Sequence, residues 1–495
     1  MGLPLEVLLG VGAAVVLLAV LAVRVSVRVG LPSLLLYLGI GVLLGEAVLG
    51  VEFSDAALTE TLGIAALVLI LTEGGLTTRW SVVRPALWIG IALSTLGVAI
   101  SIAVAGTALH LLLPLDWRTA LLWGAVLSVT DAAAVFSVLR TIGVSKRLVG
   151  ALELESGLND APAVIAVILL ANDDPLDWLT TPAQIGYELV AGAVIGGLLG
   201  LGGAWALRRA ALPATGLYPL ATVAVCVLAY ACGQGAHASG LLATYVAALI
   251  LGNAKLPHRS DTVSFAEGMG WLAQIGLFVL LGLYSSPGRL VDAVVPALVV
   301  CAVTLLLARP LSVVASAAPF RVPWREQVFL SWAGLRGAVP IVLASIALTA
   351  GAPDAQRLVD VVFVVVVLLP LLQGTTLGWL ARRLGVGSDG EVQEIEVDAA
   401  PLDELGADLI QVRVPPGSKL RGVYLRELRL PEGATVSLLV RDGSGFTPSP
   451  DTRLRELDQL LVVATADVRD ATERRIRAVD RAGRLARWRG ETGES

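Results

Sequence analysis

Charged residues are scarce over most of this 495-residue chain. Residues 1–380 contain 18 Lys and Arg and 21 Asp and Glu, whereas residues 381–495 alone contain 18 and 20. Only 16% of the whole chain is charged and 56% is hydrophobic, while a soluble globular protein is about a quarter charged. The chain therefore joins a long apolar part to a water-soluble tail, which excludes a disordered protein and a soluble enzyme with one anchor.

Cysteine and histidine are scarce as well, with three of each. Cys226, Cys232 and Cys301 lie in apolar stretches without metal-ligand spacing, so a disulfide scaffold is excluded and small packed side chains are expected. The chain also lacks a phosphate-binding loop followed by Lys and Ser or Thr, so nothing supports coupling to ATP. The basic residues are almost all arginine, which we interpret as genomic bias. We therefore expect no cofactor, no enzymatic activity and no nucleic-acid partner.

Long apolar runs dominate the first 380 residues. A membrane-spanning helix needs about 20 mostly apolar residues. Thirteen segments qualify: 4–23, 33–51, 57–74, 86–113, 119–139, 148–171, 184–206, 216–233, 238–253, 266–286, 290–313, 326–349 and 357–380. The predicted fold class is an all-α polytopic membrane protein with about 13 transmembrane helices, followed by a small cytoplasmic α+β domain. The first segment is interpreted as a retained helix, because its basic residues follow the apolar run.

The charges of the loops predict the orientation in the membrane. Short cytoplasmic loops accumulate Lys and Arg. Alternate loops between the predicted helices hold 15 basic residues, whereas the intervening loops hold only Arg118, Arg289 and Arg357. This alternation places the N-terminus outside and the C-terminal domain in the cytoplasm of a bacterial-type inner membrane.

Charged residues inside a bilayer are costly and mark functional sites by default. Six lie away from the ends of the predicted spans: Glu73, Asp131, Glu153, Glu155, Asp160 and Arg336. Glu73 lies near the cytoplasmic end of its helix, where a solvated charge is nearly as good an interpretation as a site role. Glu153 is left without a role.

Two of the acids are accompanied by hydroxyl groups. Asp131 directly follows Thr130, and Asp160 shares a helix face with Ser156, four residues earlier. Carboxylate and hydroxyl oxygens suit a hard monovalent cation. Burial disfavours the charged form of a carboxyl group, so a proton competes with the cation for the same site. Because Asn159 stands beside Asp160, one acid titrates there, and we expect electroneutral one-for-one exchange.

A buried arginine lies in the predicted twelfth span. Gly334, Gly337 and Pro340 surround Arg336 and disfavour a continuous helix. Such an arginine requires an acid, and Glu155 is the candidate. An ion pair that only braces the fold, without a transport role, is the alternative.

A second interruption is expected at residues 130–131. Predicted helices 4–6 and 11–13 form three-helix units of opposite orientation, each with its break in the middle helix. Inverted repeats with broken helices are typical of secondary transporters, whose substrate site lies near the bilayer midplane.

Four motifs carry a resemblance to a known family. They are Ser-Val-Thr-Asp (128–131), Glu-Ser-Gly-Leu-Asn-Asp (155–160), Ser-Gly-Leu-Leu-Ala-Thr-Tyr (239–245) and Gly-Leu-Arg-Gly-Ala-Val-Pro (334–340). In their order and spacing the chain resembles the monovalent cation/proton antiporter superfamily, in its NhaP-like Na+(K+)/H+ exchanger branch. The sequence departs from many relatives at Gly157, where they carry a bulkier residue, and Pro162 adds a second departure.

The resemblance implies a homodimer in which a six-helix core moves against a dimerisation domain. It implies a cation and proton site formed by Asp160, Asp131, Ser156, Thr130 and Glu73, with the transported K+ or Na+ on Asp160 and Asp131. It also implies a structural ion-pair cluster formed by Glu155, Asn159 and Arg336.

The water-soluble part follows a predicted boundary at residue 380. We expect a transmembrane exchange domain at 1–380, a linker at 381–398, a regulatory domain at 399–466 and a charged helical tail at 467–495, solvated or lying on the membrane. Strands are predicted at 409–414, 435–441 and 458–464, with a short helix at 423–430. Through Leu-Pro-Glu-Gly-Ala (430–434) and Asp-Gln-Leu-Leu-Val-Val (458–463) the domain resembles TrkA-C domains. That resemblance implies dimerisation and a small, nucleotide-like regulatory ligand at 399–466, although an assembly module without ligand remains equally open.

The expected function is secondary active antiport of a monovalent cation for H+, serving cation and pH homeostasis. K+ is the favoured cation because TrkA-C-like domains resemble parts of potassium-conductance regulators, and Na+ stays open as the alternative cation. A tail-gated cation channel is the alternative, against which the inverted repeat and the lack of a filter-like loop argue. A carrier of organic anions would require a net positive cavity.

Overall fold

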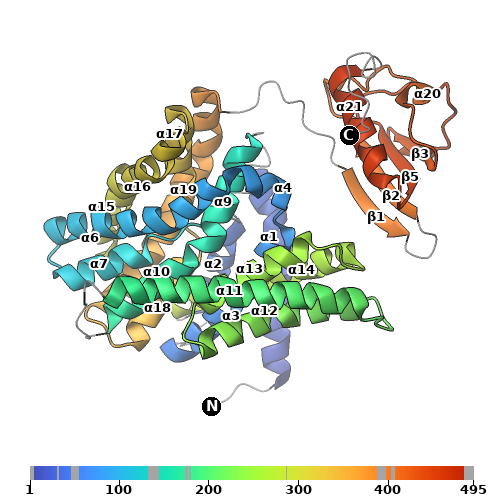
Figure 1. The fold of residues 1–495 in the computed structure, drawn as a ribbon. Helices are drawn as coiled ribbons and strands as arrows, with labels where there is room; N and C mark the ends of the chain where they lie inside the picture. The colour runs from blue at the N-terminus through green and yellow to red at the C-terminus, as the bar shows by residue number, and fades with distance from the viewer. Residues whose placement is uncertain are drawn as a thin grey trace. The chain divides into compact units, whose positions relative to one another are not determined.

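The computed structural model describes residues 5–29, 33–45, 55–131, 144–172, 177, 180–285, 287–386, 397–402 and 407–483. It separates into two compact units, Met1–Gly387 and Ser388–Ser495, each of which is described by itself (Figure 1). Residues 381–384 of the predicted linker are the last turn of a helix, and residues 387–396 lie outside the described residues.

The first unit is built from helices alone in its described part. Its first half contains α1 (Leu5–Val29), α2 (Ser33–Leu44), α3 (Ala56–Thr77), α4 (Trp80–Val83), η1 (Arg84–Ala86), α5 (Leu87–Ala92), η2 (Leu93–Gly97), α6 (Val98–Leu112), α7 (Trp117–Val126), α9 (Lys146–Leu158) and α10 (Asp160–Ala171). Its second half contains α11 (Thr180–Arg209), α12 (Leu217–Gly235), α13 (Gly240–Asn253), α14 (Arg259–Tyr284), α15 (Pro287–Val303), η3 (Thr304–Ala308), α16 (Arg309–Ala317), η4 (Ala318–Phe320), α17 (Trp324–Ala333), α18 (Val339–Thr349) and α19 (Ala355–Leu384).

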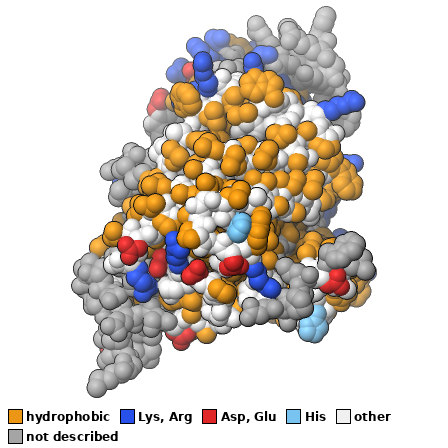
Figure 2. Space-filling model, turned by 90° about the vertical axis from the view of Figure 1, so that its left-hand side faces the viewer, with side chains coloured by type: hydrophobic (Ala, Val, Ile, Leu, Met, Phe, Trp, Pro, Cys, Tyr) orange, Lys and Arg blue, Asp and Glu red, His pale blue; other side chains and the backbone are white. Residues whose placement is uncertain are grey.

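Eight helical stretches among the described residues are long and apolar enough to cross a bilayer. α2, α13, α18 and the segment Leu9–Arg24 are shorter apolar helices. Hydrophobic side chains cover a broad band of the face in Figure 2, and charged side chains gather above and below that band. The chain is therefore a polytopic integral membrane protein, and the count of about thirteen spans remains a prediction.

Glycines allow the closest helix contacts in this unit. A Cβ on Gly196 of α11 would lie 2.4 Å from the backbone oxygen of Ala243 in α13, and one on Gly192 would lie 2.6 Å from that of Ser239. Small residues let helix backbones approach in an apolar environment, where dispersion contacts stabilise packing. The N-terminus of α13 is closed locally, since the Ser239 hydroxyl accepts a hydrogen bond from the Leu242 amide.

An interrupted helix and the non-helical segment after α7 meet inside the unit. α7 ends at Val126, and residues 127–131 continue as non-helical backbone. α17 ends at Ala333 and α18 begins at Val339, so the interruption predicted at 334–340 is present in the structure. The amide of Asp131 donates a 2.8 Å hydrogen bond to the carbonyl of Leu335, which joins the non-helical segment after α7 directly to the interruption between α17 and α18. Residues 132–143 of the predicted fifth span lie outside the described residues.

Two longer helices contain π-bulges. η2 lies between α5 and α6, and η3 lies between α15 and α16. α16 packs against η2, while η3 packs against α6, so the bulged helices are direct neighbours. A π-bulge leaves the regular hydrogen-bond ladder for one turn and frequently marks a functional site.

The second unit is a small α+β domain. It contains β1 (Val397–Leu402), β2 (Ala407–Arg413), α20 (Leu425–Leu428), β3 (Ala434–Arg441), β4 (Ser444–Phe446), β5 (Gln459–Thr465) and α21 (Arg469–Ala482). The antiparallel sheet has the order β1-β2-β5-β3-β4, and β2, β3 and β5 are the three strands predicted from the sequence. The helix expected to be solvated or to lie on the membrane is instead part of this domain, because Ile476 and Val479 of α21 are buried in its core.

Candidate functional site

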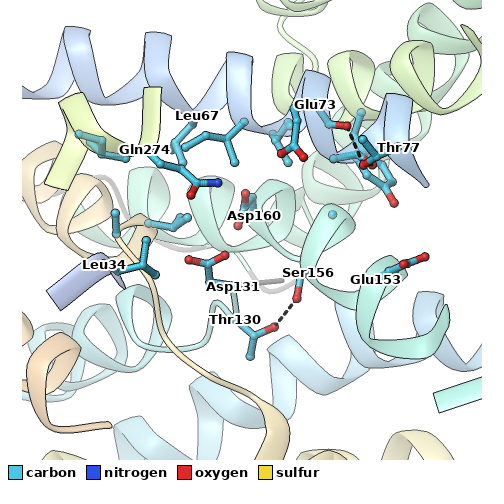
Figure 3. A pocket seen from close by; sticks show the side chains of 18 of the residues that line it. Leu34, Leu67, Glu73, Thr77, Thr130, Asp131, Glu153, Ser156, Asp160 and Gln274 are labelled. Carbon is cyan, nitrogen blue, oxygen red and sulfur yellow. Dashed lines mark hydrogen bonds between the residues drawn. The ribbon is translucent and has the colours of Figure 1, made fainter. Parts of the chain in front are cut away.

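A cavity of about 540 Å³ lies among α2, α3, α9, α10, α13, α14 and the two interruptions. Among its described lining residues are five acids: Glu73, Asp131, Glu153, Asp160 and Glu267. None of the described lining residues is lysine or arginine. Figure 3 shows the carboxylates of Asp131 and Asp160 close together in the middle, with Glu73 across the space and Glu153 towards one end. The cavity is thus electrostatically suited to cations.

Asp160 lies where two helical segments join. α9 ends at Leu158 and α10 begins at Asp160, two residues before Pro162, and Asn159 between them keeps a helical backbone conformation. Because proline has no amide hydrogen, the carbonyl of Leu158 has no helical donor. Asp160 is only 4% exposed, and its Oδ1 accepts no hydrogen bond from the described residues. A buried carboxylate oxygen without a donor is a site for a proton or a metal ion.

Asp131 is held by the interruption between α17 and α18. Its side chain lies against Gly337, where a Cβ would fall 1.7 Å from Asp131 Oδ2. Glycine is therefore required at 337 for the two interruptions to cross at this distance. Together with the bond to Leu335, this contact places the Asp131 carboxylate in the cavity beside Asp160.

Three polar side chains form a network next to the two aspartates. Asn159 Nδ2 donates a 2.8 Å hydrogen bond to Thr130 Oγ1, and the hydroxyls of Thr130 and Ser156 are 3.3 Å apart (Figure 3). All three residues are buried. The network links the α9–α10 junction to the segment after α7. Asn159 donates to the Thr130 hydroxyl, and its expected place in an ion-pair cluster stays a prediction.

The partner of Glu155 differs from the sequence-based expectation. Arg336 was expected to pair with it, but Arg309 forms the ion pair, with Nη1 on Oε1 and Nη2 2.8 Å from Oε2. Arg309 Nη2 also donates to the carbonyl of Leu330. Arg336 is buried, and within the described residues its Nε and Nη1 have no hydrogen-bond acceptor. Arg309 lies near the end of a predicted span, where a charge is ordinarily solvated, and it directly follows η3 as the first residue of α16.

Glu73 lines the cavity from α3 and approaches α14. A Cβ on Gly270 would lie 2.9 Å from Glu73 Cγ, so the glycine makes room for this side chain. Glu267 and Gln274 of α14 line the same cavity and were missed in the sequence. Glu267 lies next to the predicted start of its span, where a charge is ordinarily solvated. Across the described residues, no three acidic, histidine or cysteine side chains are close enough to hold a metal ion together.

Gly157 is explained by the residue that faces it. Tyr245 of α13 packs on Gly157, and a Cβ there would lie 2.3 Å from the Tyr245 ring. Both residues line the cavity. Glycine at position 157 thus leaves room for the aromatic ring of Tyr245 in the cavity that Ser156 and Asp160 also line.

Comparison with known proteins identifies the family. The family model "Sodium/hydrogen exchanger, transmembrane" matches residues 13–383. The chain belongs to the sodium/hydrogen exchanger family. A second model, that of the TrkA-C domain, matches residues 409–477 of this exchanger, which is the α+β unit.

Curated relatives match along most of the exchanger. The K(+)/H(+) antiporter NhaP of Alkalimonas amylolytica is 36% identical over 468 residues, which cover 92% of this chain and 80% of that protein. The K(+)/H(+) antiporter NhaP2 of Shewanella baltica is 35% identical over 462 residues, with the same coverage. The Na(+)/H(+) antiporter ApNhaP of Aphanothece halophytica is 28% identical over 337 residues, 65% of this chain and 64% of that protein.

A solved structure supports the fold. The sodium proton antiporter MjNhaP1 from Methanocaldococcus jannaschii superposes with a TM-score of 0.69, at 22% identity, over 77% of this chain and 99% of its own. The helical unit of this exchanger therefore has an NhaP-like fold.

Proposed function

We propose that the chain is an electroneutral antiporter that exchanges one monovalent cation for one H+. The observation that carries the proposal is the cavity around Asp131 and Asp160, whose described lining has five acids and no basic side chain. Family membership and the relatives named as K(+)/H(+) antiporters support it. Neither the family nor the relatives support a tail-gated channel.

The mechanism follows from competition at one acidic site. Asp160 and Asp131 hold the cation, and the hydroxyls of Thr130 and Ser156 supply neutral oxygens beside them. A proton on Asp160 has the same effect on the charge of the site as a bound cation. An empty site carries buried negative charge, which is costly to move through an apolar barrier. Only the two occupied forms cross, and this couples the fluxes.

Alternating access rests on two crossing, oppositely oriented repeats. The bond between Asp131 and Leu335 and the contact with Gly337 support such a crossing. The π-bulges support it further, because η2 lies in the first helix of the predicted repeat 4–6 and η3 in the first helix of the predicted repeat 11–13. The proposal also includes a homodimer. In each subunit a core of helices that holds the site moves against a dimerisation domain, which stays in place.

The cavity reaches the helix ends next to the arginine-rich loops. It is lined by Ser33 at the start of α2, Thr77 at the end of α3, Val149 near the start of α9 and Glu267 near the start of α14. All four positions adjoin loops that hold the excess of basic residues. With those loops in the cytoplasm of an inner membrane and the N-terminus outside, this cavity is open to the cytoplasm.

K+ is the favoured cation and Na+ remains open. The relatives that match 92% of the chain are named for K+, and they match it through the TrkA-C domain as well as the helices. The ApNhaP relative, named for Na+, matches 65% of the chain. A small, nucleotide-like ligand at residues 399–466 and an assembly role without ligand are the two proposals for the tail.

The test measures proton movement in everted membrane vesicles that contain a pH dye. Addition of K+, and separately of Na+, should dissipate a preformed proton gradient with the wild type and not with Asp160→Asn. Asp292→Asn, an exposed acid of α15 outside the cavity, serves as the matched control and should behave as wild type. Thiocyanate, which collapses the membrane potential, should leave the rate unchanged. If neither cation dissipates the gradient, antiport is refuted; if thiocyanate changes the rate, electroneutrality is refuted.

A further inference from the structure

A second cavity adjoins the first. It measures about 240 Å³ and shares three lining residues with the larger one: Thr77, Val149 and Glu153. Its own lining includes the basic residues Arg79 and Lys146. Glu153 is the only acid among its described lining residues, and it belongs to both cavities.

Glu153 lies on the same helix face as the central aspartate. Val149, Glu153, Ser156, Gly157 and Asp160 all line the larger cavity, at the three- and four-residue spacing of one helical stripe. Seven residues of helix separate Glu153 from Asp160, which is about 10 Å along the axis. The stripe therefore leads from the smaller cavity, past Glu153, to the site at Asp160.

The Glu153 carboxylate has an oxygen available for an ion. Its Oε2 is buried and accepts no hydrogen bond from the described part of the chain. The side chain is half-buried, and Figure 3 shows it set apart from Asp131 and Asp160, towards the Thr77 end of the cavity. It is thus neither a member of the central site nor part of a structural ion pair formed by described residues.

We propose that Glu153 contacts the cation on its way between the smaller cavity and Asp160 and raises the affinity for it. The inference rests on the proposed function. A monovalent cation that passes Arg79 and Lys146 meets positive charge, and a carboxylate at the junction offsets that repulsion. The ion exchanges part of its water for the free Glu153 oxygen and then moves along the stripe, where Ser156 offers the next oxygen before Asp160.

The experiment compares cation dependence in the same vesicles for Glu153→Gln, Glu153→Asp and the wild type. Glu153→Gln keeps the size and removes the charge, so the KM for K+ should rise about fivefold or more, with the maximal rate within about twofold of wild type. Glu153→Asp keeps the charge and should restore most of the affinity. Glu326→Gln is the matched control, because Glu326 also has a buried oxygen without a partner among the described residues but lines neither cavity. This control should leave the KM unchanged.

A measurement on the wild type keeps the test independent of folding of the variants. Dicyclohexylcarbodiimide, which modifies buried carboxyl groups, should label Glu153, and K+ should protect it in proportion to occupancy. An unchanged KM in Glu153→Gln, an equal rise in Glu326→Gln, or labelling of Glu153 that K+ does not reduce would overturn the inference. These outcomes bear on Glu153 only if the wild type exchanges K+ for H+ in the same vesicles. If the wild type shows no exchange, the proposed function is refuted instead.

Discussion

Asp131, in the segment after α7, touches Gly337 in the interruption between α17 and α18, and a single methyl group on Gly337 would fall 1.7 Å from Asp131 Oδ2. The contact joins segments about two hundred residues apart and places one of the two central carboxylates. The position of the proposed cation site therefore depends on glycine, which has no side chain, at residue 337.

Gly337→Ala should abolish cation-dependent proton movement and destabilise the protein, because the methyl group displaces Asp131 from the cavity. Overpacking of this kind typically costs about 1–3 kcal/mol. The measurement is exchange in vesicles together with thermal unfolding in detergent. Gly276→Ala in α14 is the control, since a Cβ there meets no atom within 4 Å and should leave both properties unchanged. Wild-type exchange in Gly337→Ala would contradict the geometry.

Removal of one partner from the Glu155–Arg309 pair should destabilise the exchanger strongly. Both side chains are buried, and a single uncompensated buried charge costs about 3–5 kcal/mol. Glu155→Gln and Arg309→Met should each lower the unfolding temperature, while the double variant should recover much of the loss. If Glu155→Gln is destabilising and Arg309→Met is not, the acid relies on another partner, and Arg336 is then the residue to change.

Thr130→Val should weaken cation binding while the protein still folds. The substitution removes the hydroxyl beside Ser156 and leaves Asn159 Nδ2 without its acceptor, a loss of about 1–3 kcal/mol for a buried donor. We expect a severalfold higher KM for the cation in the vesicle assay. Thr130→Ser, which retains the hydroxyl, should stay close to wild type. Equal behaviour of the two variants would show that the hydroxyl has no part in the site.

The stability contributed by Asp116 should depend on pH. This residue caps α7, where hydrogen bonds from Thr119 and from the Arg118 amide lower the pKa of its carboxyl group. A lowered pKa means that the contribution is complete above the unfolded value of about 4 and is lost as the pH falls through the lower folded value. Asp116→Ala should therefore cost about 1 kcal/mol at pH 7 and progressively less in strong acid. Thermal unfolding across pH measures this, and Asp116→Asn, which can still cap, should show little pH dependence; a constant difference for Asp116→Ala would refute the cap.

Local sequence predicted much of the site because its main stripe is local. Ser156 and Asp160 are four residues apart on one helix, and Thr130 adjoins Asp131, so spacing alone groups these residues. The structure brings all four, with Glu73, to one cavity, while their roles in ion binding remain predictions. The interruption at 334–338 was predictable for the same reason, because glycine and proline disfavour helix at their own positions in the chain.

Contacts between residues far apart in the sequence could not be predicted from the sequence. Glu155 pairs with Arg309, 154 positions away, whereas the charge pattern alone pointed to Arg336 as its partner. Glu267 was overlooked because a charge near a helix start usually faces water; its side chain is exposed, but it also lines the cavity, because α14 packs against α2 and α3. In the tail, the arginine-rich α21 was expected in solvent or on the membrane, but its Ile476 and Val479 are buried in the core of the α+β domain.

The amino-acid sequence by itself determined the apolar helices, the interruption after Ala333 and the acids whose charge is costly in a bilayer, because these follow from composition, from helical periodicity and from the backbone preferences of glycine and proline. Tertiary packing alone decided which arginine neutralises Glu155, how Gly337 admits Asp131, and that Glu153 belongs to two cavities. The physical reason is that hydrophobicity and backbone geometry act over a few residues, whereas pairing of buried charges and closure of a cavity depend on which distant side chains the fold brings together.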